Sequence, residues 1–289
     1  PGQQAIKVNA DQDGYADYGI IECSRIELTH EGRSHIRNGC YTGGIDMHKA
    51  RGWIVRRNHI SGFWCESGLS EHGIHFWSAS RDTLIEGNVI VDCARGIGLG
   101  LGQSGADRPY ADHPYPASGY LGHIDGLIRN NFVAASDTAL LASQFGFDVG
   151  IALEQVRGAQ ILHNTVASTV APYSSIEWRF SNTAVELANN LVTHNLRARD
   201  GGQSTSTANL ENANSNWFVD IGTGDLHLTS QALLPLDAGA SLAPTAAPFD
   251  FDAQLRDSRP DIGADERDPA VLFGDGFESG GLARWITPP

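Results

Sequence analysis

The sequence predicts an all-β solenoid, a three-sided parallel β-helix of about six or more coils with an irregular C-terminal cap. The first observation is a repeated asparagine with an aliphatic residue three positions before it and another two positions after it; these asparagines are Asn58, Asn88, Asn131, Asn164 and Asn190. The second is an apolar strand, usually opened by Gly-Ile, ahead of these units; the strands start at Ile6, Ile45, Ile74, Ile97, Ile151 and Ile176. Units of this length bury their apolar face by stacking on the next unit, as solenoids do.

The repeat divides the chain into three parts. Residues 1–195 carry the coils, residues 196–268 keep little periodicity and are expected to form a cap with wrapping loops, and residues 269–289 form a tail. Within the coils, residues 102–121 (GQSGADRPYADHPYPASGYL) break the period. An insertion on one coil is expected to overhang one face of a solenoid.

Composition excludes some classes of protein. The formal net charge is −14, which argues against nucleic acid as a partner because phosphate binding needs clustered Lys and Arg. No apolar run approaches the ~18–20 residues that would cross a bilayer. The chain begins PGQQAIKV, which is strand-like and shows no signal peptide, so we expect a processed or truncated N-terminus. We expect a monomer.

The four cysteines lie in the first third of the chain: Cys23, Cys40, Cys65 and Cys93. An even, clustered set is compatible with two disulfides in an exported protein. Buried free thiols are the alternative, and both interpretations stay open. The gaps are too long for a zinc knuckle.

The repeat units resemble those of right-handed parallel β-helix proteins of the pectate-lyase-like kind over roughly residues 5–195. The five asparagines match the ladder of stacked amides at one corner of that fold. RPDIGADE (259–266) is similar to a closing motif of secreted bacterial β-helix proteins, and LFGDGFESGGLARW (272–285) resembles a tail motif of exported bacterial proteins. The resemblance implies a right-handed coil and a secreted, periplasmic or cell-surface location.

Strand alternation sorts the residues of the Gly-Ile strands by face. One outward column is Lys7, Asp46, His75, Gly98, Ala152 and Glu177. A second is Asn9, His48, Trp77, Gly100, Glu154 and Arg179. We expect Gly98 and Gly100 to form the floor of a saccharide groove, walled by the ionisable residues and an exposed Trp77, and roofed by an aromatic loop with Tyr110, His113 and Tyr115. Simple cross-strand ion pairs on a solvated sheet are the plainer interpretation.

These columns suggest a lyase that acts by β-elimination on a uronate-containing glycan. Such an enzyme needs a base at C5, an acid for the leaving oxygen and a cation for the carboxylate. We expect His75 to be the base, with Asp46 fixing its tautomer, and His48 or a nearby arginine to be the acid. Lys7 is a weaker candidate base because a neighbouring Asp46 would raise its pKa. Trp77, Glu154, Glu177 and Arg179 would bind substrate.

Calcium is suggested by Asn9-x-Asp11-x-Asp13-Gly-x-x-Asp17, which places oxygen ligands at alternate positions around a glycine turn. The match is partial because no Glu stands at the twelfth position, and an Asx-rich turn explains the residues as well.

Three alternatives remain. A non-catalytic carbohydrate-binding or adhesion protein would also use Trp77 and the tyrosine loop. An inverting glycoside hydrolase would use Glu154 and Glu177 on adjacent coils, about 8 Å apart on the diagonal, although a neighbouring Arg179 would keep Glu154 ionised. Glu71, His72 and His75 are close enough in sequence for a zinc cluster to be conceivable.

Overall fold

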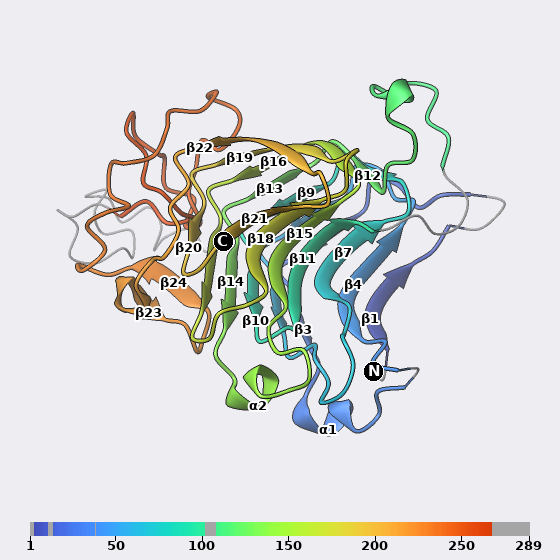
Figure 1. Cartoon of the computed structure of the whole chain (residues 1–289), viewed down its shortest axis with the longest axis horizontal. Helices are drawn as coiled ribbons and strands as arrows, with labels where there is room; N and C mark the ends of the chain where they lie inside the picture. The colour runs from blue at the N-terminus through green and yellow to red at the C-terminus, as the bar shows by residue number, and fades with distance from the viewer. Residues whose placement is uncertain (1–2, 11–13, 38, 102–107, 268–289) are drawn as a thin grey trace, which may run out of the picture.

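The structure, a computed structural model, describes residues 3–10, 14–37, 39–101 and 108–267. Its core is a right-handed three-sided parallel β-helix made of three all-parallel sheets, which confirms the predicted fold class (Figure 1). The tail motif at 272–285 lies outside the described residues. No helix among the described residues is long and apolar enough to span a membrane.

Successive coils add strands to the three sheets in turn. The seven-stranded sheet stacks β1 (Gln4–Val8), β4 (Gly43–His48), β7 (His72–Trp77), β11 (Arg95–Gly100), β15 (Val149–Glu154), β18 (Ser174–Arg179) and β21 (Leu196–Arg199). The six-stranded sheet stacks β3 (Arg25–Glu27), β6 (His59–Ser61), β10 (Val89–Val91), β14 (Phe132–Ala135), β17 (Thr165–Ser168) and β20 (Leu191–Val192). The nine-stranded sheet contains β2 (Ile20–Glu22), β5 (Ile54–Arg56), β8 (Ser80–Arg81), β9 (Leu84–Glu86), β12 (His123–Ile124), β13 (Leu127–Arg129), β16 (Val156–Leu162), β19 (Ala184–Ala188) and β22 (Gln203–Thr207). Two of the coils contribute a pair of strands to the nine-stranded sheet, β8 with β9 and β12 with β13.

Single helical turns lie at the corner between the six-stranded and seven-stranded sheets. These are α1 (His30–Arg33) and α2 (Thr138–Leu141), and a 3₁₀ turn, η1 (Pro116–Ser118), lies in the insertion. The parallel strands continue past residue 195, because β21 pairs with β18 and β22 pairs with β19. Leu196 therefore starts a seventh coil that the Gly-Ile pattern does not mark.

The asparagine ladder forms at the corner between the nine-stranded and six-stranded sheets. Each Nδ2 donates to the Oδ1 of the next coil, for example 2.9 Å from Asn88 to Asn131 and 2.9 Å from Asn131 to Asn164. Asn209 adds a sixth rung, 2.8 Å from Asn190. The residue before each rung has a positive φ, as Arg57, His163 and Asn189 show, and this left-handed residue makes the sharp turn. The ladder satisfies backbone groups that the turn would otherwise leave buried and unpaired.

The glycines that open the strands leave room for the core. A Cβ at Gly96 would lie 2.3 Å from the backbone oxygen of Gly150 and 2.8 Å from Val133 Cγ1. Gly44, Gly73 and Gly150 meet equivalent aliphatic side chains of the six-stranded sheet. The inward isoleucines that follow these four glycines, and Ile176 after Ser175, are fully buried; they are Ile45, Ile74, Ile97, Ile151 and Ile176.

The C-terminal segment covers the outer face of the six-stranded sheet. Its hairpin pairs β23 (Phe218–Asp220) with β24 (Asp225–Leu228), after the 3₁₀ turn η2 (Ser215–Trp217). A second apolar cluster joins Leu226 and Ile262 of this segment to Phe132 and Leu191 of the sheet. The closing motif at 259–266 is therefore part of a packed cap.

One disulfide, Cys40–Cys65, joins the segments that precede β4 and β7. Cys23 is free and exposed, and Cys93 is free and buried. The disulfide interpretation therefore holds for Cys40 and Cys65, and the interpretation as a buried free thiol holds for Cys93.

Candidate active site on the seven-stranded sheet

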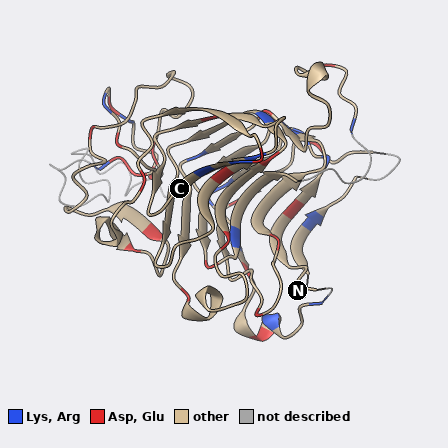
Figure 2. Cartoon of the chain, in the orientation of Figure 1, with Lys and Arg blue, Asp and Glu red and all other residues tan. Residues whose placement is uncertain are grey.

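The outward columns predicted from the sequence are present in the seven-stranded sheet. Lys7 pairs in register with Asp46, and Asp46 pairs with His75. The second column continues from His48 to Trp77. Figure 2 shows acidic and basic residues gathered on β1 and β4 at one end of this sheet and on β18 and β21 at the other. The sheet therefore carries two groups of charged side chains.

Asp46 is the centre of the first group. Its side chain is only 2% exposed, and Oδ2 lies 2.8 Å from Lys7 Nζ and 3.2 Å from His48 Nε2. Trp77 Nε1 donates to Oδ1 over 2.7 Å. Burial alone would raise the pKa of Asp46, but the hydrogen bonds from His48 and Lys7 outweigh it and hold that pKa well below its usual range. Asp46 is thus a permanent carboxylate that orients three side chains.

Tyr41 completes this group, which we call the Asp46 cluster (Lys7, Tyr41, Asp46, His48 and Trp77). The Tyr41 hydroxyl donates to Asp46 Oδ2 over 3.2 Å and accepts a short hydrogen bond from Lys7 Nζ. Burial would lower the pKa of Lys7, but its hydrogen bonds to Asp46 and Tyr41 raise it above the ordinary value. Lys7 is therefore a resident cation, which agrees with the expectation that it makes a poor base. Its side chain is 30% exposed and that of His48 is 20% exposed, so the cluster can be reached from solvent.

His75 occupies a different environment from the one expected. Its side chain is 1% exposed, and Nε2 lies 2.9 Å from the carbonyl oxygen of Gly100. The carboxylate beside it is Glu71, 3.3 Å from Nδ1, and not Asp46. The expected pairing of Asp46 with the His75 tautomer is therefore wrong, because Asp46 is bound by Lys7, His48 and Trp77 instead.

Two further expectations about the groove need correction. Gly98 is not an open floor, because the His72 ring lies over it, and a Cβ there would come within 2.8 Å of three ring atoms. Trp77 is half-buried, not exposed: its ring stacks on His75 with centroids 5.5 Å apart and meets His48 edge-on at 4.3 Å. Strand alternation assigned the face of these residues correctly but did not predict that neighbouring rings cover it.

The insertion does not cover the glycines in its described part. Tyr110 packs with Leu121 and Ile124, next to β8 and β12, and its hydroxyl donates to Ala79 O over 2.8 Å. Tyr115 donates to Asp125 over 2.8 Å. The aromatic residues therefore lie at the corner of the nine-stranded sheet, where Figure 1 shows η1 standing away from the coils.

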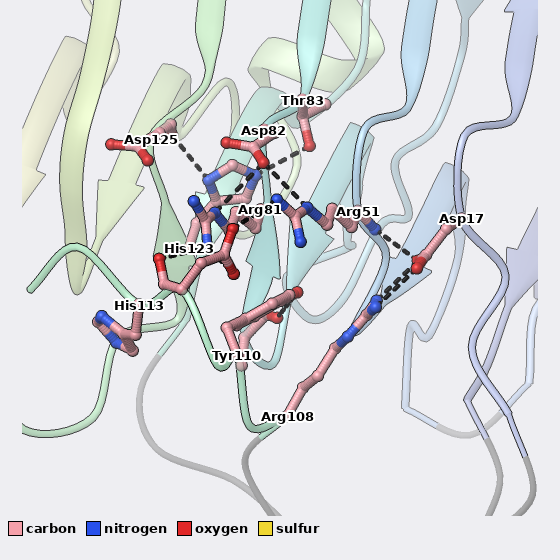
Figure 3. Close-up of polar contacts among 12 residues, drawn as sticks. Asp17, Arg51, Arg81, Asp82, Thr83, Arg108, Tyr110, His113, His123 and Asp125 are labelled. Atoms are coloured by element: carbon pink, nitrogen blue, oxygen red, sulfur yellow. Dashed lines mark hydrogen bonds and ion pairs between the residues drawn. The ribbon is translucent and has the colours of Figure 1, made fainter. Parts of the chain in front are cut away.

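Arginines surround this corner, as Figure 3 shows. Arg51 contacts Asp82 and Asp112 at 3.1 and 2.9 Å, and Arg81 contacts Asp112 at 2.9 Å. Arg108 and His113 line a cavity of about 360 Å³ beside Tyr110. The acidic partners compensate these arginines, so this corner is an internally paired network.

Asp17 belongs to the same network. Both of its oxygens accept from Arg108, at 2.6 Å each, and this hydrogen bonding lowers the pKa of Asp17. Asp11 and Asp13 lie outside the described residues, so the calcium loop with Asn9 stays a prediction. In the structure Asp17 accepts from the Arg108 guanidinium and, over 2.9 Å, from the backbone N–H of Arg51.

The second charged group lies at β15 to β21. Arg199 binds Glu177 at 3.0 Å, and Ser174 Oγ donates to Glu177 over 2.9 Å. Burial raises the pKa of Glu154 despite Arg179 Nη1 at 3.7 Å from its carboxylate. The loss of hydration on burial therefore outweighs an ion pair of this length in setting the direction of the Glu154 pKa shift.

Sequence reasoning missed Tyr41 and Arg199. Tyr41 lies before β4 in a loop without periodicity, and only its position next to Cys40 marks it. Arg199 belongs to the seventh coil, which the asparagine at 209 reveals once the ladder is extended by one rung. No protein-family model matches this chain, and no curated protein matches it either.

Proposed function

We propose that the protein cleaves a uronate-containing polysaccharide by β-elimination at the Asp46 cluster. The observation that carries the proposal is the Tyr41 hydroxyl held between the ammonium of Lys7 and the carboxylate of Asp46. The proposed base is the Tyr41 phenolate, with the Lys7 ammonium as its counter-cation. The pair is reachable at the end of an elongated sheet, which suits a polymer.

Each step of the elimination has a group in this cluster. Tyr41 acts as the phenolate, its own proton having passed to solvent, and takes the proton from C5, while Lys7 stabilises the negative charge that develops on the uronate carboxylate. His48, next to Asp46 and partly exposed, gives a proton to the leaving O4. Asp46 is a positioning residue that fixes the other groups. His75 is not assigned the base in this proposal because its ring is buried and bonded to Gly100.

The inverting hydrolase is less well supported. Burial raises the pKa of Glu154, which is the direction a general acid needs, but the partner carboxylate must activate a water molecule. Glu177 is 6% exposed and accepts hydrogen bonds from Arg199 and Ser174. Its oxygens therefore already accept hydrogen bonds from the protein, and this favours a structural role for Glu177 over activation of a water molecule.

The test uses a panel of uronate polymers in D₂O. Elimination produces an unsaturated uronate that absorbs in the ultraviolet, and NMR reports exchange at C5. We expect Tyr41→Phe to lower turnover by about 10²-fold or more, since a general acid or base contributes on that order. Tyr18→Phe is the matched control because Tyr18 is 70% exposed in the bend before β2.

Three outcomes decide the proposal. Unsaturated products that depend on Tyr41 support it. Exchange at C5 without chain cleavage would retain the proton abstraction and overturn the elimination. Binding of a glycan with neither reaction would overturn catalysis and favour a carbohydrate-binding protein.

A further inference from the structure

A second group of side chains lies beside the Asp46 cluster and is not used by the proposed reaction. Glu71 precedes β7, and His72 and His75 both belong to that strand. Glu71 Oε2 lies 3.8 Å from His72 Nδ1 and 3.3 Å from His75 Nδ1. Three ligand atoms, one from each residue, lie within 4.8 Å of one another. The histidine side chains are 3% and 1% exposed.

These buried atoms lack hydrogen-bond partners. Glu71 Oε2, His72 Nδ1 and His75 Nδ1 each make no hydrogen bond of acceptable geometry. Burial of unpaired polar atoms costs on the order of 1–3 kcal/mol each. Three such atoms within 4.8 Å of one another form a site that a bound cation would satisfy.

The tautomer of His75 strengthens this argument. Its Nε2 is 2.9 Å from the Gly100 carbonyl oxygen, and a carbonyl can only accept, so Nε2 carries the hydrogen. In the neutral ring Nδ1 then has a free lone pair that faces the Glu71 carboxylate. Metal-binding histidines commonly donate their second nitrogen to a backbone carbonyl in this way.

We propose that Glu71, His72 and His75 bind one divalent transition-metal ion of the zinc type. Two imidazoles and a carboxylate match zinc ligand chemistry, with bonds of about 2.0–2.2 Å. Tetrahedral geometry at that bond length separates ligand atoms by roughly 3.3–3.6 Å, close to the measured 3.3 and 3.8 Å. Three protein ligands leave a fourth position for water or another small ligand.

The site would also support the Asp46 cluster. His75 stacks on Trp77 with an interplanar angle of 5°, and Trp77 donates to Asp46. A metal that fixes the His75 ring therefore fixes the indole that orients Asp46. The binding proposal itself does not depend on the reaction proposed for that cluster.

Metal binding is measured on untagged full-length protein, first stripped with a chelator and then titrated with Zn²⁺ by calorimetry. Co²⁺ provides a second measurement, because its visible absorption reports tetrahedral coordination. We expect one ion per chain, and an affinity about 100-fold or more weaker in Glu71→Gln and His72→Gln. His30→Gln is the matched control because His30 lies exposed in α1.

Circular dichroism and thermal unfolding check that each variant is folded. Glu71 is 23% exposed, so Glu71→Gln tests the proposal even if the buried His72→Gln does not fold. Failure of the folded wild-type protein to bind either ion would overturn the proposal, and so would equal affinity in wild type and Glu71→Gln. Binding without the visible spectrum of tetrahedral Co²⁺ would overturn the assigned coordination geometry.

Discussion

At the residue scale, the pKa of a buried carboxyl group in this protein depends on its hydrogen-bond partners as well as on its burial. Asp46 and Glu154 are both largely buried carboxyl groups on the seven-stranded sheet. Hydrogen bonds from Lys7 and His48 lower the pKa of Asp46, whereas Arg179 at 3.7 Å from Glu154 is too weakly placed to offset its burial. Two acids on one sheet therefore differ in protonation behaviour because of hydrogen-bond geometry.

His227 of β24 supports a prediction about pH. Burial alone would lower its pKa, but Asp252, Asp265 and Asp225 outweigh this and raise it from 6.5 to about 9. Nδ1 lies 2.5 Å from Asp225 and Nε2 lies 3.0 Å from Asp252. A raised folded pKa stabilises the protein fully below pH 6.5 and loses this contribution as the pH rises through about 9.

We expect His227→Gln to remove that pH dependence. The wild type should lose on the order of 1–2 kcal/mol between pH 6.5 and 9 from this group, allowing for partial exposure. Chemical denaturation at several pH values measures it, and His35→Gln is a control at an exposed histidine. Parallel curves for wild type and His227→Gln would contradict the assignment.

At the scale of elements, the strand register could be predicted from the sequence. The side chains that lie over the outward face of the strands could not. The asparagine ladder fixes where each coil turns, so the pairs Lys7 with Asp46 and Asp46 with His75 follow from sequence alone. The positions of Tyr41 and Glu71 do not, because both lie in loops whose conformation depends on tertiary contacts. The burial of His75 likewise requires knowing that Trp77 and His72 lie against it.

Gly96, near the start of β11, provides a test of how tightly the long strands pack against the core. Gly96→Ala would place a Cβ 2.3 Å from a backbone oxygen and 2.8 Å from Val133, so a core strand must shift. We expect a loss of about 2–4 kcal/mol in the free energy of unfolding, typical of severe overpacking. Gly14→Ala is the control because a Cβ there meets no atom of the described residues within 4 Å. Equal stability of the two variants would show that the strand adjusts freely.

At the scale of the whole molecule, the three sheets have different roles. The six-stranded sheet packs under the C-terminal segment, and the nine-stranded sheet supports the arginine corner of Figure 3. The seven-stranded sheet carries both the Asp46 cluster and the Glu71, His72 and His75 group. Both proposed sites therefore lie on one face of three, and Tyr41 and Glu71 reach that face from loops.

The disulfide should matter to both stability and turnover. Cys40 and Cys65 are 25 residues apart, and a loop of this length is stabilised by on the order of 3 kcal/mol. We expect Cys40→Ser with Cys65→Ser to lower the melting temperature and to reduce turnover further than the stability loss explains. Calorimetry and the elimination assay measure both effects, with Cys23→Ser as the control at a free, exposed thiol. A variant with full turnover would show that the bridge does not position Tyr41.

The same cross-link ties the site to the chemistry of its surroundings. Cys40 immediately precedes Tyr41, and Cys65 lies in the segment that leads to Glu71, so one covalent bond anchors a loop of each group. In a reducing compartment the bridge would open and both loops would lose their tether. The asparagine ladder would still hold the coils, but the loops that carry Tyr41 and Glu71 would not be fixed on the seven-stranded sheet. Oxidation of the two cysteines would then be the final step of maturation.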